Sequence, residues 1–121
     1  MPITVKATRE GLLGQKTATG DILDRRRPIV ALPSTKALDR FVRVTNPLTH
    51  LSAIALVDDV GPFNEHDEAY VFGDGTVRPA AELGKSVSGN GTNGAGIDLG
   101  EVVWAAIGMR DNTDVSWEFI S

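Results

Sequence analysis

The sequence predicts a small, mainly β domain with one short helix, and three observations support this fold class. First, 13 glycines and 6 prolines separate short apolar runs, which is typical of strands joined by turns. Second, several of these runs alternate apolar and polar residues, as half-buried strands do. Third, a single stretch has the apolar spacing of an amphipathic helix. The chain has no internal repeat, so we expect one domain over residues 1–121.

Five stretches are predicted to be strands because they are short, apolar or alternating, and bounded by turn residues. They cover residues 3–8, 27–33, 40–47, 51–58 and 114–120. Only a short turn separates the third stretch from the fourth, so we expect these two to pair as a hairpin. In the last stretch, Val115, Trp117 and Phe119 alternate with other residues and are predicted to share one face.

The predicted helix covers residues 98–109. Its apolar residues recur at intervals of three and four and would form one stripe: Leu99, Val102, Val103, Ala106 and Ile107. Asp98 comes just before this stripe, where a carboxylate can accept the free amide hydrogens of the first turn as an N-cap. Gly108 marks the expected end of the helix.

Residues 64–95 show little periodicity and are predicted to form a long loop, which in a compact domain is usually either functional or disordered. Disorder is one expectation for residues 86–94. His66 lies in an acidic part of this loop, but its spacing to the neighbouring acids matches no metal motif. We therefore expect a hydrated loop there, and neither a metal site nor a cofactor.

The composition of the chain argues against several classes of binding partner. The formal net charge of -4 disfavours a nucleic acid or an anionic membrane as a partner. The absence of cysteine excludes disulfides, cysteine nucleophiles and thiolate metal sites. No apolar stretch approaches the roughly 18 residues of a membrane span, and no signal peptide is visible at the start. The compartment and the oligomeric state stay open.

The stretch "VDDVGPF" places two charges where burial is costly. An apolar run over residues 53–57 ends on Asp58 and Asp59, and Gly61-Pro62 then stops the strand. Neighbouring residues of a strand point to opposite sides, so we expect Asp58 and Asp59 to face apart. The simplest interpretation of Asp58 is a solvated or backbone-capping carboxylate at a strand end.

Six stretches in series resemble the double-psi β-barrel domains, among them rare lipoprotein A, the expansins, the barwin-like proteins and the catalytic domain of membrane-bound lytic transglycosylase A. They are, in order, "TATGD", "PIVALPS", "FVRVTNP", "ALVDDVGPF", "GIDLG" and "VSWEFI". The similarity is greatest to the rare lipoprotein A branch. It implies a six-stranded double-psi β-barrel with one or two short helices and a long loop.

The resemblance also implies a site. Asp59 takes the position of the family's groove aspartate, and Asp98 that of a second acid in the same groove. In the lytic transglycosylases one such acid protonates the glycosidic oxygen between N-acetylmuramic acid and N-acetylglucosamine, then takes a proton from the sugar's own 6-hydroxyl. By resemblance, Asp59 is the expected acid/base, with Asp98 supporting it and Asp21 as a further catalytic candidate.

Several substrate contacts follow from the same resemblance. Thr8 matches a threonine that lines the expansin groove, and Thr19 and Asp24 lie in or just after "TATGD". In the loop, Tyr70 offers a flat apolar face and Asn93 a hydrogen-bonding group, although the loop could equally be a lid over the barrel end. One departure matters: rare lipoprotein A proteins have a histidine where this sequence has Ala31.

The sequence leaves three functions open. The first is a peptidoglycan-degrading glycosidase of lytic transglycosylase type, or a hydrolase with two carboxylates, acting on cell-wall glycan. The second is a non-catalytic, expansin-like polysaccharide-binding module, which the residue Ala31 favours. The third is a structural component of a phage or secretion assembly. Likeness of fold alone does not choose among them.

Overall fold

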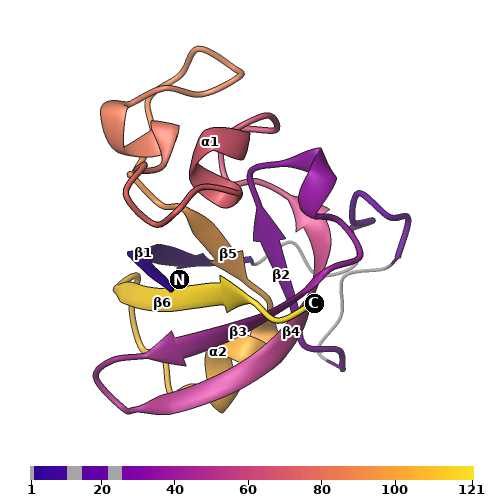
Figure 1. Ribbon diagram of the computed structural model, residues 1–121. Helices are drawn as coiled ribbons and strands as arrows, with labels where there is room; N and C mark the ends of the chain where they lie inside the picture. The colour runs from indigo at the N-terminus through magenta and orange to yellow at the C-terminus, as the bar shows by residue number, and fades with distance from the viewer. Residues whose placement is uncertain (1, 11–14, 22–25) are drawn as a thin grey trace.

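Six strands form a closed barrel in the computed structural model of the chain, which describes residues 2–10, 15–21 and 26–121. They are β1 (Ile3–Arg9), β2 (Ile29–Leu32), β3 (Phe41–Asn46), β4 (Leu51–Val60), β5 (Ile97–Leu99) and β6 (Asp114–Phe119). Their order around the barrel is β1-β5-β2-β4-β3-β6 (Figure 1). The mainly β fold class and the closed six-stranded barrel are confirmed.

The pairing of the strands agrees with their residue patterns. β3 and β4 form the expected antiparallel hairpin, with Phe41 opposite Leu56 and Asn46 opposite Leu51. On β6, Val115 and Trp117 are buried and Phe119 packs against the core beside them, as alternation predicts. The interior is apolar because β1 to β6 all direct one set of alternate side chains inward: Val5, Ala7, Val30, Leu32, Val42, Val44, Val57, Ile97, Leu99, Val115 and Trp117.

The stretch predicted as one helix over residues 98–109 is divided between a strand and a shorter helix. Ile97–Leu99 is the strand β5, which pairs in parallel with β1 and antiparallel with β2. Helix α2 covers only Glu101–Ala106, and its N-cap is Gly100. The N-cap role predicted for Asp98 is therefore wrong, because pairing on both sides extends the backbone there. Gly108, with φ +71, follows the helix as expected.

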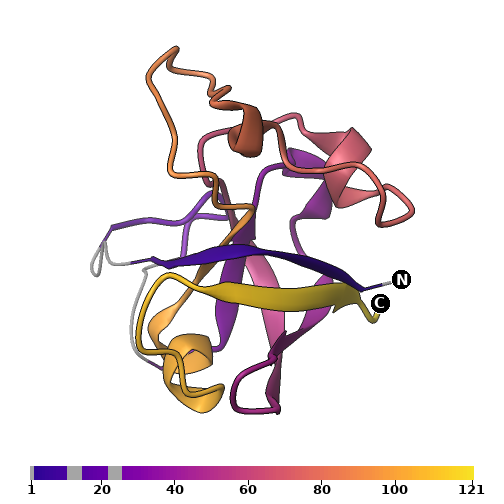
Figure 2. The ribbon, with the colours of Figure 1, turned by 90° about the vertical axis from the view of Figure 1, so that its left-hand side faces the viewer.

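Residues 64–95 cover one end of the barrel, and α2 lies at the other end (Figures 1 and 2). This covering segment contains helix α1 (Glu68–Val71) and a 3-10 turn, Ala80–Leu83. The hydroxyl of Thr92 donates to the Ala81 carbonyl, so hydrogen bonds hold part of residues 86–94 in place. Within the described residues, no helix has both the length and the apolar character needed to cross a bilayer.

Candidate functional site

A row of four residues crosses four neighbouring strands. Thr8 on β1 pairs with Asp98 on β5, and Asp98 pairs in turn with Ala31 on β2. Ala31 also pairs with Asp59 on β4. The two aspartates are thus two strand spacings apart, about 10 Å between backbones, with only a methyl group between them. The structure brings together the two acids that the sequence separates by 39 residues.

A β-bulge decides the direction of Asp59. The register between β2 and β4 runs from Val30 opposite Val57 to Ala31 opposite Asp59, so Asp58 is an extra residue. Val30 and Val57 belong to the packed hydrophobic cluster, whereas Ala31, although only 1% exposed, is not part of it. Simple alternation after Val57 would turn Asp59 inward, whereas the extra residue turns it to the outer face that Ala31 occupies. The bulge therefore places Asp59 in the same row as Asp98.

Asp98 is a half-buried acid whose pKa is raised to about 6. Burial is the main cause, and the negative charge of Asp59 adds to it. The hydrogen bond that the Thr8 hydroxyl donates to Asp98 Oδ1 lowers the pKa and opposes both effects. A Cβ at Gly61 would lie 3.7 Å from Asp98 Oδ2, an ordinary contact distance, so Gly61 lies directly beside the second oxygen.

Asp59 is held by backbone amides. Its Oδ1 accepts hydrogen bonds from the amides of Ala18, at 2.9 Å, and Val60, at 3.0 Å. These bonds fix the carboxylate beside the end of β4 and attach the segment 15–21 to it. The side chain itself is half-buried. Asp59 is thus oriented by the main chain, as a group that must meet a ligand in one geometry would be.

Glu10, which no motif in the sequence singled out, joins these acids. Its amide donates to the Leu99 carbonyl at 2.8 Å, which continues the β1–β5 pairing one residue further. Its Oε2 is buried and has no hydrogen-bond partner among the described residues. The pKa of Glu10 is raised to about 9, first by burial, then by a hydrogen bond with Asp59 and by the nearby carboxylates. Glu10 lies two residues beyond Thr8, and strand alternation could have placed it on the same face.

Asp58 is buried, which corrects the expectation of a solvated carboxylate. Only 1% of its surface is exposed. Thr19 donates to its Oδ1, and Thr17 and Arg27 donate to Oδ2 at 3.2 and 3.3 Å. Burial is compensated by these donors, including one positive charge. Asp58 therefore anchors the "TATGD" segment to β4 through its side chains, while Asp59 does so through the Ala18 amide.

Asp21 and Thr19 lie in that anchored segment and are exposed. The pKa of Asp21 is lowered, chiefly by hydrogen bonding with the Asp58 carboxyl group and then by Arg27 and Thr19. A carboxylate held ionised in this way is poorly suited to donate a proton. The contacts thus make Asp21 and Thr19 part of the support around Asp58. Asp24, the other candidate from this region, lies outside the described residues.

The two loop candidates, Tyr70 and Asn93, are each held by hydrogen bonds to residues outside the acid pair. Tyr70 is buried in the core, and its hydroxyl donates to the Gly96 carbonyl at 2.8 Å. This corrects the expectation that Tyr70 offers a flat face to a sugar. Asn93 is exposed, but its Oδ1 accepts from the Ala95 amide and its carbonyl oxygen accepts from Lys6. These bonds hold the end of the covering segment against β1.

The described residues contain no group of three or more metal-binding side chains. His66 is exposed, and its Nδ1 lies 4.0 Å from Glu68 Oε1. The ionisable side chains that the structure brings together around Thr8 and Ala31 are carboxyl groups. Glu10 and Asp98 both have raised pKa values, and together with Asp59 they are called here the acid cluster.

Comparisons with known proteins place this geometry in context. A family model described as a domain of unknown function (DUF8814) matches residues 1–118. No curated protein matches the chain. A papain inhibitor from Streptomyces superposes with a TM-score of 0.57 at 14% identity, over 100% of this chain and 96% of the inhibitor. An expansin mutant from Clavibacter michiganensis, in complex with cellohexaose, superposes with a TM-score of 0.55 at 17% identity, over 100% of this chain and 51% of the expansin.

Both neighbours have folds of the double-psi β-barrel type, and this chain spans about half the length of the expansin. At such low identity the likeness establishes the fold of the chain and nothing further. The double-psi barrel fold is thus confirmed. The closer resemblance to rare lipoprotein A and the lytic transglycosylases stays a prediction.

Proposed function

The chain belongs to the DUF8814 domain family, and we propose that its barrel binds and cleaves cell-wall glycan at the acid cluster. The observation that carries this proposal is the row Thr8–Asp98–Ala31–Asp59, which brings two acids from β4 and β5 to one outer face. The expansin neighbour, which is similar in fold, was solved with cellohexaose, a linear sugar chain. That likeness supports a polysaccharide as the class of ligand.

The proton donor in this proposal is Asp98. A pKa of about 6 leaves much of this carboxyl group protonated in mildly acidic solution, where an ordinary aspartate is ionised. This favours Asp98 over Asp59 as the acid and revises the order expected from the sequence. Asp59, fixed by two backbone amides, then acts through its negative charge, which keeps the Asp98 pKa high and stabilises positive charge on the sugar.

The reaction of lytic transglycosylase type balances without water. Asp98 gives its proton to the glycosidic oxygen as the bond from the N-acetylmuramic acid carbon to that oxygen breaks. The 6-hydroxyl oxygen of the same sugar bonds to that carbon, and its proton returns to Asp98. The product is an anhydro sugar, and the enzyme recovers its starting protonation state. A water molecule in place of the 6-hydroxyl would instead give hydrolysis with a reducing end.

A second function, glycan binding without cleavage, is favoured by Ala31. This residue lies between the two aspartates at the position where rare lipoprotein A proteins have histidine. A methyl group can neither donate nor accept a proton, so the row lacks an imidazole that could assist either acid. The acid cluster would then contribute hydrogen-bond acceptors for sugar hydroxyls alone.

Digestion of purified peptidoglycan sacculi separates these functions. Anhydro-muropeptides in the soluble fraction, found by mass spectrometry, support transglycosylase action, and reducing-end products support hydrolysis. Asp98→Asn is expected to abolish product formation, and Asp59→Asn to reduce it by roughly a hundredfold or more. Asp114→Asn, an exposed change at the start of β6, is the matched control.

Binding to sacculi without product from any glycan supports the second function, glycan binding without cleavage. If a protein with a normal melting transition neither binds sacculi nor releases product, both glycan functions are contradicted. The structural component of a phage or secretion assembly is then the remaining function. Equal activity of Asp98→Asn and the unchanged chain would remove Asp98 from the reaction.

A further inference from the structure

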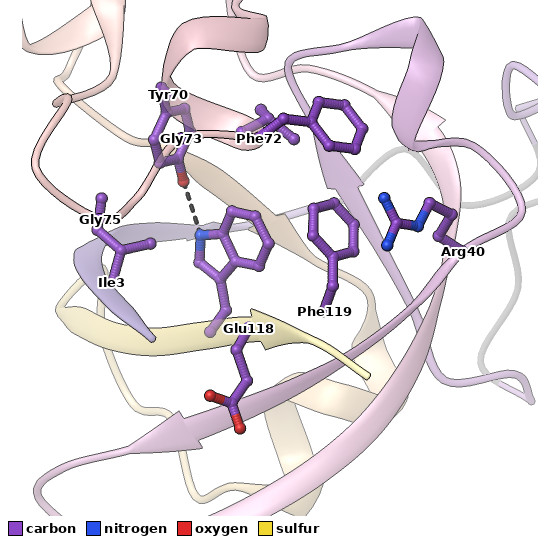
Figure 3. A pocket seen from close by; sticks show the side chains of 10 residues that line it. Ile3, Arg40, Tyr70, Phe72, Gly73, Gly75, Glu118 and Phe119 are labelled. Carbon is purple, nitrogen blue, oxygen red and sulfur yellow. Dashed lines mark hydrogen bonds between the residues drawn. The ribbon is translucent and has the colours of Figure 1, made fainter. Parts of the chain in front are cut away.

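A cavity of about 210 Å³ lies beneath the covering segment, where α1 and the residues after it face β6. We call it the α1 pocket, and Figure 3 shows its lining. Its main lining residues are Arg40, Phe72, Gly73, Gly75, Trp117 and Phe119. Its lining includes none of Glu10, Asp59 and Asp98, so this pocket is separate from the acid cluster.

Aromatic rings form one wall of the α1 pocket. The rings of Phe72 and Phe119 are stacked, with centroids 5.2 Å apart and planes 14° apart, and Trp117 meets Phe119 edge-on at 5.1 Å. The Trp117 indole donates to the Tyr70 hydroxyl at 2.8 Å, which fixes the wall from behind. Phe72 is 40% exposed, so a large apolar ring stands at the mouth of the pocket. Such a wall suits a flat apolar group.

Arg40 supplies a positive charge that is already positioned. Its guanidinium carbon lies 4.0 Å from the Phe119 ring centroid and 5.4 Å from that of Phe72. Its Nε donates to a main-chain oxygen of Ser121, the last residue of the sequence, at 2.9 Å. The two terminal nitrogens have no hydrogen-bond acceptor among the described residues. Two donors of one planar group are therefore free to bind a carboxylate with both oxygens.

No acidic side chain that lines the α1 pocket is paired with this guanidinium. Glu118 is the one acidic residue among those that line it. Its side chain points away from the rings of Trp117 and Phe119, as strand alternation requires (Figure 3). Arg43 donates to its Oε1 at 3.3 Å on that other face. The lining thus presents donors and apolar rings without a facing carboxylate side chain, which favours an acidic ligand over a neutral sugar.

We propose that the α1 pocket binds a small carboxylate that carries a flat apolar ring. The carboxylate pairs with the two free nitrogens of Arg40, and the ring packs on Phe72. The volume is below the roughly 300 Å³ at which pockets for drug-sized ligands begin, so the ligand is about the size of one ring with its acid group. This proposal is independent of glycan cleavage.

Benzoate is a suitable probe, with benzamide as a neutral analogue of the same shape. Titration of the ¹⁵N-labelled protein is followed by NMR at the Trp117 indole and at the amides of Gly73 and Gly75. Benzoate is expected to shift these signals with a Kd on the order of millimolar, as befits a ligand of this size, and benzamide to bind at least about tenfold more weakly.

Two variants and one control complete the test. Arg40→Gln is expected to weaken benzoate binding about tenfold or more, and Phe72→Ala to weaken it severalfold without touching the charge. Arg43→Gln removes a neighbouring arginine that faces outward and is expected to leave binding unchanged. The melting transition of each variant is measured first, and Phe72→Ala decides the outcome if Arg40→Gln fails to fold.

Three results would overturn the proposal. The first is the absence of shifts at these three positions with benzoate at roughly 20 mM, well above the expected Kd. The second is equal binding of benzoate and benzamide. The third is displacement of benzoate from these positions by a neutral cello-oligosaccharide that binds more tightly, which would make the pocket a sugar site.

Discussion

Thr8 donates a hydrogen bond to Asp98, its register partner on the neighbouring strand β5. This bond stabilises the ionised form of an acid that burial and a second carboxylate push toward the protonated form. The pKa of about 6 is the balance of these effects. Each of these contributions can be removed by a substitution.

Thr8→Val is expected to raise the pKa of Asp98, because it removes a donor to the carboxylate and leaves the burial. A rise of roughly one pKa unit is expected. The side-chain carboxyl signal of Asp98, followed by ¹³C NMR against pH, measures it without any assay of activity. If Asp98 is the proton donor, the alkaline limb of glycan cleavage moves up by the same amount. Thr4→Val, at an exposed position of β1, is the control, and an unchanged or lower pKa contradicts the prediction.

Asp98→Asn is expected to stabilise the fold above about pH 6. The folded state holds the Asp98 proton more tightly than the unfolded state, so stability falls as the pH rises from about 4 to about 6. Asparagine removes this loss, which amounts to about 2–3 kcal/mol at most. Urea unfolding at about pH 4 and about pH 8 checks the sign, since the gain should appear only at the higher pH. A gain of equal size at both values would point to a cause other than titration.

Glu10→Gln is also expected to stabilise the fold, over a wider pH range than Asp98→Asn. The pKa of Glu10 is raised to about 9, so its destabilising effect grows from the ordinary range of a glutamate up to that value. The variant should melt at a higher temperature than the unchanged chain in alkaline solution, and the difference should disappear in acid. Glu82→Gln, at an ion pair in the covering segment, serves for comparison. A variant that loses stability in alkaline solution would show that Glu10 is not buried as a protonated acid.

Asp58→Ala is expected to loosen the segment 15–21, because Thr17, Thr19 and Arg27 lose a shared acceptor that is buried. The loss of stability should be about 1–3 kcal/mol, since the hydroxyls and the guanidinium can partly turn to water. Amide exchange of Ala18 should accelerate as the segment detaches. Asp21 is an exposed acid that also binds Arg27. Asp21→Ala should change the stability by less than about 0.5 kcal/mol. A larger loss for Asp21→Ala than for Asp58→Ala would reverse the roles given to these two residues.

Tyr70→Phe is expected to destabilise the covering segment without affecting glycan binding. The hydroxyl bridges the Trp117 indole and the Gly96 carbonyl, and phenylalanine leaves both buried groups unpaired. The cost should be about 1–3 kcal/mol by urea unfolding. Binding to sacculi should match that of the unchanged chain. Weaker binding at full stability would restore Tyr70 as a sugar contact.

Much of the fold could be predicted from the residues because its signals are local. Val115, Trp117 and Phe119 alternate, and alternation reports which face of a strand is buried whatever the neighbouring strands are. The strand β5 was the exception. Ile97–Leu99 is too short to show a period, and Leu99 also fits the helical spacing of the residues that follow it. Only its two partners, β1 and β2, make this segment extended.

The sequence by itself determined the barrel class, the strand ends that carry acids, and Asp59 and Asp98 as the pair to examine. Tertiary structure alone decided that Asp58 is an extra residue at a bulge, that Tyr70 is buried, and that Glu10 joins the acid cluster. The physical reason is distance along the chain. Thr8 and Asp98 are 90 residues apart, and the register that joins them depends on how all six strands close together.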